Sequence, residues 1–346
     1  MARSILSRLR FVAPLIAALV LTTIGVRTYL QVNPSSLVGT TDDPPTIVYI
    51  KPKTGVQEIA KLLEEAGVIR SAWVFLSVAY VQGSLTRLQA GEYEFPLGTP
   101  MLDILRRLET GRVLTHQVTI PEGFTALDIA QLLASERLAN ADRFMALARD
   151  AKFAESLGLP VASLEGYLFP DTYRLSRGMP EEEILRIMVA RFREVLPPDL
   201  EEQAERLKLD THGVITLASL IEKEAKLDSE RPLVSAVFYN RLKRNMPLQS
   251  DPTAMYGVAD SRRRVTPIDL QRKTPYNTYL IAGLPPGPIA NPGQASILAA
   301  LNPARVDYLY FVAKNDGTHF FSRTFEQHNQ AVRDYQVKSK GTGDHS

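Results

Sequence analysis

A run of uncharged residues near the start of the chain constrains its organisation more than any other feature. Residues 11–26, FVAPLIAALVLTTIGV, carry no charged side chain; three arginines precede them, and no acidic residue occurs before Asp42. A helix needs roughly 20 apolar residues to cross a bilayer, and the run reaches that length when it is counted to Leu30. Because basic residues favour the cytoplasmic flank, we expect residues 1–10 in the cytoplasm and 11–30 as a single transmembrane anchor.

A cleaved signal peptide would begin in the same way, with basic residues ahead of an apolar run. It would also need a small-x-small cleavage site after the run, and the sequence offers no clear one. We therefore expect an uncleaved anchor, which in a bacterium would place the rest of the chain on the extracytoplasmic side of the inner membrane. Residues 31–45, rich in Pro, Ser and Thr, are typical of a linker, and residues 338–346 form a polar tail.

Composition excludes several classes of protein. Of the 346 residues, 45% are hydrophobic and 23% charged, as in an ordinary globular protein that is long enough for a sizeable core. A net charge of +2 provides no basic field for nucleic acid. There is no cysteine, which excludes disulfides and zinc–thiolate sites, and the five histidines lack metal-ligand spacing. We expect neither a metal nor a cofactor.

Residues 46–112 show an alternation of strand and helix patterns. TIVYI, from Thr46, and GEYEF, from Gly91, predict strands, and two helices are predicted between them, the second around residues 71–81. This β-α-α-β order resembles a LysM-type glycan-binding module. A small α+β domain with no binding role would show the same order, so the pattern leaves both interpretations open.

The remainder of the chain, residues 113–337, predicts a larger α+β domain. A capping-box pattern at Thr125 marks the start of one helix, and helical periodicity dominates residues 145–227. After Asn245, Pro, Gly, Asn and Tyr crowd into about fifty residues, and loops of such length are usually functional or disordered. Their many aromatic and apolar residues argue against disorder. YLYFV and HFFS, separated by an Asp-Gly turn, predict a closing hairpin.

The segment LASLIEKEAKL, residues 217–227, places two glutamates beside an apolar helix face. At about 100° per residue, Glu222 and Glu224 fall about 80° to either side of that face, on opposite shoulders. Two solvated charges would show the same pattern, and the helical geometry alone does not separate one glutamate from the other. Glu222 lies beside Ala218 and Ser219, small residues that leave room for a cleft.

Polar and aromatic residues in two segments are candidates for contacting a glycan. A glycan presents hydroxyl groups and flat apolar sugar faces, which tyrosines and side-chain amides on positioned loops can bind. Turn formation or core packing would explain individual members equally well. The candidates, from EGYLFPDTY and from the loops after Asn245, are Glu165, Tyr167, Asp171, Tyr173, Gln249, Ser250, Asp251, Thr253, Tyr256, Tyr276, Asn277, Thr278 and Tyr279.

Six motifs, taken in order, resemble the MltG (YceG-like) family of endolytic murein transglycosylases, bacterial inner-membrane proteins that act on nascent peptidoglycan. The motifs are EGYLFPDTY, IEKEA, VFYNRL, LQSDPT, PYNTY and GLPPGPIANPG. The resemblance covers nearly everything after the expected anchor and agrees with a LysM-like N-terminal module. It implies that the first glutamate of E-K-E, Glu222, is catalytic, and that a penicillin-binding synthase is the partner. Ser250 stands where threonine also occurs in the family, a change that keeps the hydroxyl.

The implied reaction cleaves the β-1,4 bond between N-acetylmuramic acid and N-acetylglucosamine. The C6 hydroxyl of the muramic acid attacks C1 and leaves a 1,6-anhydro end, so one glutamate can act first as acid and then as base. A free glutamate, with a pKa of about 4.3, is protonated in only about 1 in 500 molecules at pH 7, so Glu222 would need dry surroundings. Such cuts in nascent strands would terminate their elongation.

Two other functions stay open. The chain could be a non-catalytic glycan-binding scaffold of cell-wall synthesis. It could also be a hydrolytic muramidase that uses water and a second acid, Asp251 or Glu165.

Overall fold

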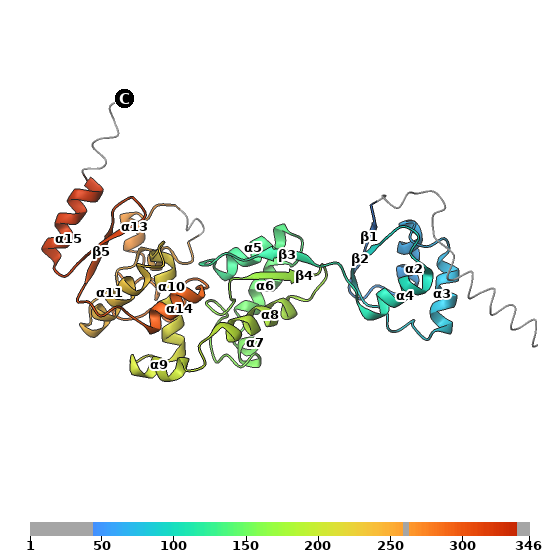
Figure 1. Cartoon of the computed structure of the whole chain (residues 1–346), viewed down its shortest axis with the longest axis horizontal. Coiled ribbons are helices and arrows are strands. Elements are labelled where there is room, and N and C mark those ends of the chain that lie inside the picture. The colour runs from blue at the N-terminus through green and yellow to red at the C-terminus, as the bar shows by residue number, and fades with distance from the viewer. Residues whose placement is uncertain (1–43, 259–262, 338–346) are drawn as a thin grey trace, which may run out of the picture. The chain divides into compact units, whose positions relative to one another are not determined.

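The computed structural model describes residues 44–258 and 263–337 (Figure 1). The expected anchor at 11–30 and the polar tail at 338–346 lie outside the described residues, as does all but the end of the linker. Within the described ranges, no helix combines the length and the apolar character that crossing a bilayer requires.

The chain separates into two compact units. The first comprises the described part of residues 1–116 together with 174–179, and the second comprises the described part of 117–173 and 180–346. Both contain helices and short strands, so the α+β class is confirmed.

The first unit contains a two-stranded antiparallel sheet with three helices. β1 (Thr46–Ile50) pairs with β2 (Gly91–Phe95), and α2 (Val56–Glu65) and α3 (Ala72–Val81) connect the two strands. α4 (Met101–Thr110) follows β2. The predicted β-α-α-β order is therefore confirmed, whereas its likeness to a glycan-binding LysM module stays a prediction.

The second unit is mostly helical, with two short sheets. β3 pairs with β4, and β5 pairs with β6 as the predicted antiparallel hairpin. Its elements are β3 (His116–Thr119), α5 (Ala126–Ser135), α6 (Ala141–Ala148), α7 (Ala151–Ser156), β4 (Thr172–Leu175), α8 (Glu181–Val195), α9 (Leu200–Arg206), α10 (Thr211–Glu224), α11 (Arg231–Lys243), α12 (Asp251–Met255), α13 (Pro267–Leu270), α14 (Gln294–Leu301), β5 (Tyr310–Ala313), β6 (His319–Ser322), α15 (Phe325–Val332) and the π-helical turn η1 (Arg333–Val337).

Helix α10 lies in the core of the second unit. Its N-terminus is capped by Asp210, whose side chain accepts a hydrogen bond from the Gly213 N–H at 2.7 Å. Every residue of 214–221 is buried, because α9, α11, α12 and α14 surround the helix. The sequence pattern predicted one apolar face, whereas this stretch is enclosed all round. After this buried stretch, the last turn of the helix carries Glu222 and Glu224, which are both partly exposed.

Two local predictions about the second unit are confirmed. Thr125 and Asp128 form the capping box at the start of α5, each side chain accepting from the other's backbone N–H. The segment rich in Pro, Gly and Tyr after Asn245 is ordered over its described part, where it forms the short helices α12 and α13 and packs against the core.

Candidate active site

Three hydrogen-bond donors hold the carboxylate of Glu222. Its Oε2 accepts from Arg231 Nη1 at 3.2 Å, from Ser296 Oγ at 2.8 Å and from the Gly293 N–H at 3.1 Å. The side chains of Glu222 and Arg231 are each only 7% exposed. A buried guanidinium together with two further donors fixes the position of a carboxyl group. The arrangement therefore suits an anchor that ties α10 to α11 and α14.

A further carboxyl group, Glu122, lies beside this anchor. Its Oε2 is 3.8 Å from Arg231 Nη2, and its side chain is about half exposed. Burial and then the charge of Glu222 raise the pKa of Glu122, while Arg231 opposes the shift. A Cβ at position 293 would lie 1.8 Å from Glu122 Oε1, so Gly293 is what admits this side chain.

Glu224 has a much sparser environment than Glu222. Its Oε1 accepts a hydrogen bond from Ser250 Oγ at 2.5 Å, and its Oε2 accepts none from the described residues. Burial raises the pKa of Glu224 to about 7; the Ser250 hydrogen bond acts against this shift and the charge of Asp251 adds to it. The residue nevertheless retains some exposed surface. A carboxyl group that titrates near neutrality suits a proton carrier.

Buried hydroxyl and amide groups fix the loops around Ser250. The Ser250 N–H donates to Thr278 Oγ1 at 3.0 Å, the Thr278 N–H donates to Thr253 Oγ1 at 3.1 Å, and Thr253 Oγ1 donates to the Ser250 carbonyl at 2.6 Å. The Asn277 amide donates to two backbone carbonyls. All four residues are at most 1% exposed. Their contact with a ligand stays a prediction, and this burial favours a positioning role instead.

Asp251, Tyr279 and Gln249 retain exposed surface on the same loops. The Tyr279 hydroxyl donates to Asp251 Oδ1 at 2.6 Å, which fixes the carboxylate that acts on Glu224. Gln249 adopts a left-handed φ of 53°, and its Oε1 accepts from Arg241 Nη1 at 3.1 Å. Contact of these three residues with a ligand stays a prediction, which their exposed surface permits.

Glu165 forms a second buried carboxyl site. Its Oε1 accepts from the Ala126 N–H at 3.0 Å and from Asn291 Nδ2 at 3.1 Å, and its Oε2 accepts from the Tyr256 hydroxyl at 3.1 Å. Burial raises the pKa of Glu165 to about 7, against the hydrogen bonds from Ala126 and Tyr256. The rings of Tyr256 and Tyr276 lie 4.6 Å apart, so three of the predicted residues do come together here.

The other residues predicted from EGYLFPDTY have different surroundings. Tyr167 is 2% exposed, bonds to His212 Nδ1 through its hydroxyl at 2.7 Å and packs edge-on against Phe192. Tyr173 is also buried and donates to a backbone carbonyl. Asp171 accepts from Arg191 Nε at 2.6 Å, and its hydrogen bonds lower its pKa. Binding of substrate by these three residues is disfavoured, because core packing or an ion pair already occupies each polar group.

Sequence reasoning missed four residues that organise these sites. They share no motif spacing, because most of their partners lie far along the chain. Asn291 is the clearest case: its Oδ1 accepts from the Gly166 and Leu168 N–H groups at 2.8 and 2.9 Å. An asparagine inside the otherwise apolar and proline-rich GLPPGPIANPG was the one available signal. The four residues are Glu122, Arg231, Asn291 and Ser296.

Comparison with known proteins identifies the family. The model of the YceG-like family matches residues 48–334. The endolytic murein transglycosylase of Bacillus subtilis (strain 168) is 35% identical over 316 residues, which cover 86% of this chain and 87% of that protein. A protein of the same name from Streptococcus pneumoniae serotype 2 is 32% identical over 319 residues, which cover 83% of this chain and 57% of that protein.

A solved structure agrees with this assignment. The crystal structure of a yceG-like protein from Listeria monocytogenes is 31% identical in sequence, with a TM-score of 0.58, and the match covers 83% of this chain and 98% of that one. The resemblance stated from the six sequence motifs is therefore confirmed, and the chain belongs to the YceG-like family.

Proposed function

We propose that this protein is an endolytic peptidoglycan transglycosylase and that Glu224 carries the proton in its reaction. The names of the relatives from Bacillus subtilis and Streptococcus pneumoniae support the activity. The observation that carries the choice of residue is the contrast within one helical turn, where Glu222 is held by Arg231 and Glu224 is not. With a pKa of about 7, about half of the Glu224 side chains are protonated at pH 7.

In the proposed reaction, Glu224 gives one proton to the leaving oxygen and regains another from the C6 hydroxyl. The acid protonates the glycosidic oxygen as the bond from that oxygen to C1 of N-acetylmuramic acid breaks. The carboxylate left behind then takes the proton of the C6 hydroxyl as the C6 oxygen bonds to C1. The products are a 1,6-anhydro end and an N-acetylglucosamine end with a restored hydroxyl, and water takes no part. Ser250 holds Oε1, which leaves Oε2 to face the sugar.

Glu222, the residue expected from the sequence, is the competing candidate. We would incubate purified glycan strands with Glu224→Gln and with Glu222→Gln, and count anhydro-ended products by mass spectrometry. Loss of a general acid typically costs about 10²–10⁴ in rate, so Glu224→Gln should yield almost none. Glu222→Gln keeps an oxygen that can accept from the donors at Ser296 and Gly293, so it should retain activity. Near-complete loss in a folded Glu222→Gln, with activity retained in Glu224→Gln, would return the role to Glu222.

The same assay separates the other two functions. A hydrolase would leave reducing ends in place of anhydro ends, with Asp251 or Glu165 as the second acid. A scaffold would bind strands and leave them uncut. The burial of Glu165 and the bond from Tyr279 to Asp251 favour supporting roles for both carboxyl groups.

Location and partners are proposed from the sequence. Residues 11–30 would anchor the protein in the inner membrane with residues 1–10 in the cytoplasm, 46–112 would form a LysM-like module and 113–337 the catalytic domain. A penicillin-binding synthase that makes the strands would be the partner. Protease digestion of spheroplasts tests the orientation: the body of the chain should be cleaved from outside, and protection of the body would contradict it.

A further inference from the structure

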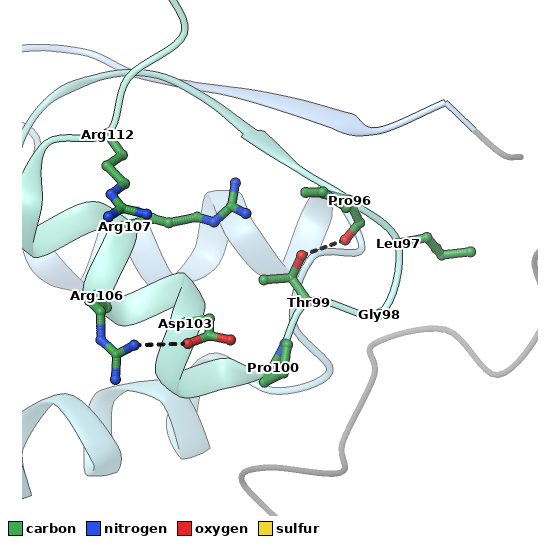
Figure 2. A pocket seen from close by; sticks show the side chains of 9 residues that line it. All are labelled: Pro96, Leu97, Gly98, Thr99, Pro100, Asp103, Arg106, Arg107 and Arg112. Carbon is green, nitrogen blue, oxygen red and sulfur yellow. Dashed lines mark hydrogen bonds and ion pairs between the residues drawn. The ribbon is translucent and has the colours of Figure 1, made fainter. Parts of the chain in front are cut away.

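A hollow of about 380 Å³ lies in the first unit, beside the turn that joins β2 to α4 (Figure 2). This volume falls within the range of sites for small ligands. One wall is apolar, and the other is basic. The residues that form them are Pro96, Leu97 and Pro100 on the turn, and Arg106, Arg107 and Arg112 on α4 or just after it.

The positive charge around this hollow is only partly balanced. Arg106 lies 3.4 Å from Asp103, the only carboxylate among the lining residues. Arg107 Nη1 donates to the Glu94 carbonyl at 2.9 Å, which holds the guanidinium in place without neutralising it. The backbone N–H of Arg112 donates to the Arg107 carbonyl at 3.0 Å, but its guanidinium makes no hydrogen bond or ion pair with any described residue. Figure 2 draws that side chain beside the side chain of Arg107 on the lining of the hollow.

Arginines gathered on one concave surface repel one another, and an oxyanion between them relieves that repulsion. The guanidinium fork matches carboxylate and phosphate in geometry and can bind either with two parallel hydrogen bonds. The apolar wall favours a ligand that carries small aliphatic groups next to its charge. Asp103 disfavours a multiply charged phosphate, because its own negative charge faces the same space.

We propose that this hollow binds a free carboxylate on a short peptide, namely the stem peptide of peptidoglycan. The identity of the polymer rests on the proposed function, whereas the site itself rests on the geometry of the first unit. Stem peptides end in a carboxylate flanked by alanine methyl groups, which matches a basic wall opposite an apolar one. The first unit would thereby distinguish glycan strands that carry peptides from strands without them. It would do so by binding the peptide and not the sugar.

The test measures binding of diacetyl-lysyl-D-alanyl-D-alanine to the full-length protein by calorimetry. The free acid should bind at least tenfold more tightly than its C-terminal amide, because only the acid carries the charge. Arg112→Gln should weaken binding of the acid by about tenfold, and Arg112→Lys by less, since the charge stays but the fork is lost. Arg70→Gln is the matched control: it removes an exposed arginine of the same unit outside the hollow and should leave binding unchanged.

Several results would overturn this proposal. They are equal binding of acid and amide, no measurable binding, or binding unaffected by Arg112→Gln. Binding of phosphatidylglycerol vesicles or inorganic phosphate that depends on Arg112, without peptide binding, would instead assign the hollow to a phosphate. Anhydro-ended products are measured on the same samples. Their formation without peptide binding refutes the hollow alone, and peptide binding without them refutes the proposed activity alone.

Discussion

Replacing Arg231 with methionine tests whether Glu222 is an anchored carboxylate. The substitution keeps the aliphatic volume and removes the guanidinium that contacts Glu222, Ser296 and Asp228. Because Arg231 and Glu222 are both nearly buried, the change leaves a carboxylate with no cation in direct contact. Breaking a buried pair from one side costs about 3–5 kcal/mol. In a unit of this size, each kcal/mol lowers the melting temperature by roughly 2–4 °C, so a fall of about 10 °C is expected.

The assay is thermal unfolding followed by circular dichroism at pH 7, with Arg191→Met as the matched control. Arg191 Nε lies 2.6 Å from Asp171 Oδ2, but the two side chains are 42% and 34% exposed. A pair of that kind contributes about 1 kcal/mol at most, so Arg191→Met should shift the melting temperature by no more than a few degrees.

A double variant completes this test. When Glu222→Gln is combined with Arg231→Met, neither member of the pair is left as a buried charge. Much of the stability that Arg231→Met loses should therefore return. Two results would refute the anchoring role of Glu222. One is a melting temperature of Arg231→Met that is no lower than that of Arg191→Met. The other is a double variant whose melting temperature lies below that of Arg231→Met by as much as Glu222→Gln alone lowers it.

Two further predictions follow from the buried carboxyl groups. The charge of Asp251 helps to raise the pKa of Glu224, so Asp251→Asn should lower that pKa and shift the alkaline limb of the rate profile to lower pH; an unchanged limb in a folded variant would contradict this coupling. The pKa of Glu165 is about 7 in the folded state and about 4.3 in the unfolded state, so the folded state binds more protons between these values and stability falls as the pH rises through them. Glu165→Gln should remove up to about 3 kcal/mol of this fall in the free energy of unfolding. Melting temperatures of both proteins at pH 5 and pH 8 measure the difference, and an equal change with pH in the variant and the native protein would count against the prediction.

Local sequence signals predicted the elements of this fold well. The strand at Thr46, the strand at Gly91 and the capping box at Thr125 depend on neighbours within a few residues, and all three are observed. The closing hairpin was equally predictable, because two short runs rich in aromatic residues flank an Asp-Gly turn.

The site was harder to predict, because its chemistry depends on distant partners. A helical wheel placed Glu222 and Glu224 on equivalent shoulders, and the small neighbours Ala218 and Ser219 favoured a cleft beside Glu222. Arg231 and Ser296 give Glu222 its partners, while Ser250 approaches only Glu224. The resemblance supplied the motif that holds both glutamates, and only the packing of α10 against the surrounding helices and loops distinguished their environments.

The central claim is that Glu224 exchanges its proton near neutral pH while it faces the substrate. Carbon-13 NMR titration of glutamate-labelled protein tests it most directly, with Glu224→Gln used to assign the signal. The Glu224 carboxyl resonance should move with a midpoint near pH 7. A midpoint near 4.3, the value of a glutamate in water, would contradict it.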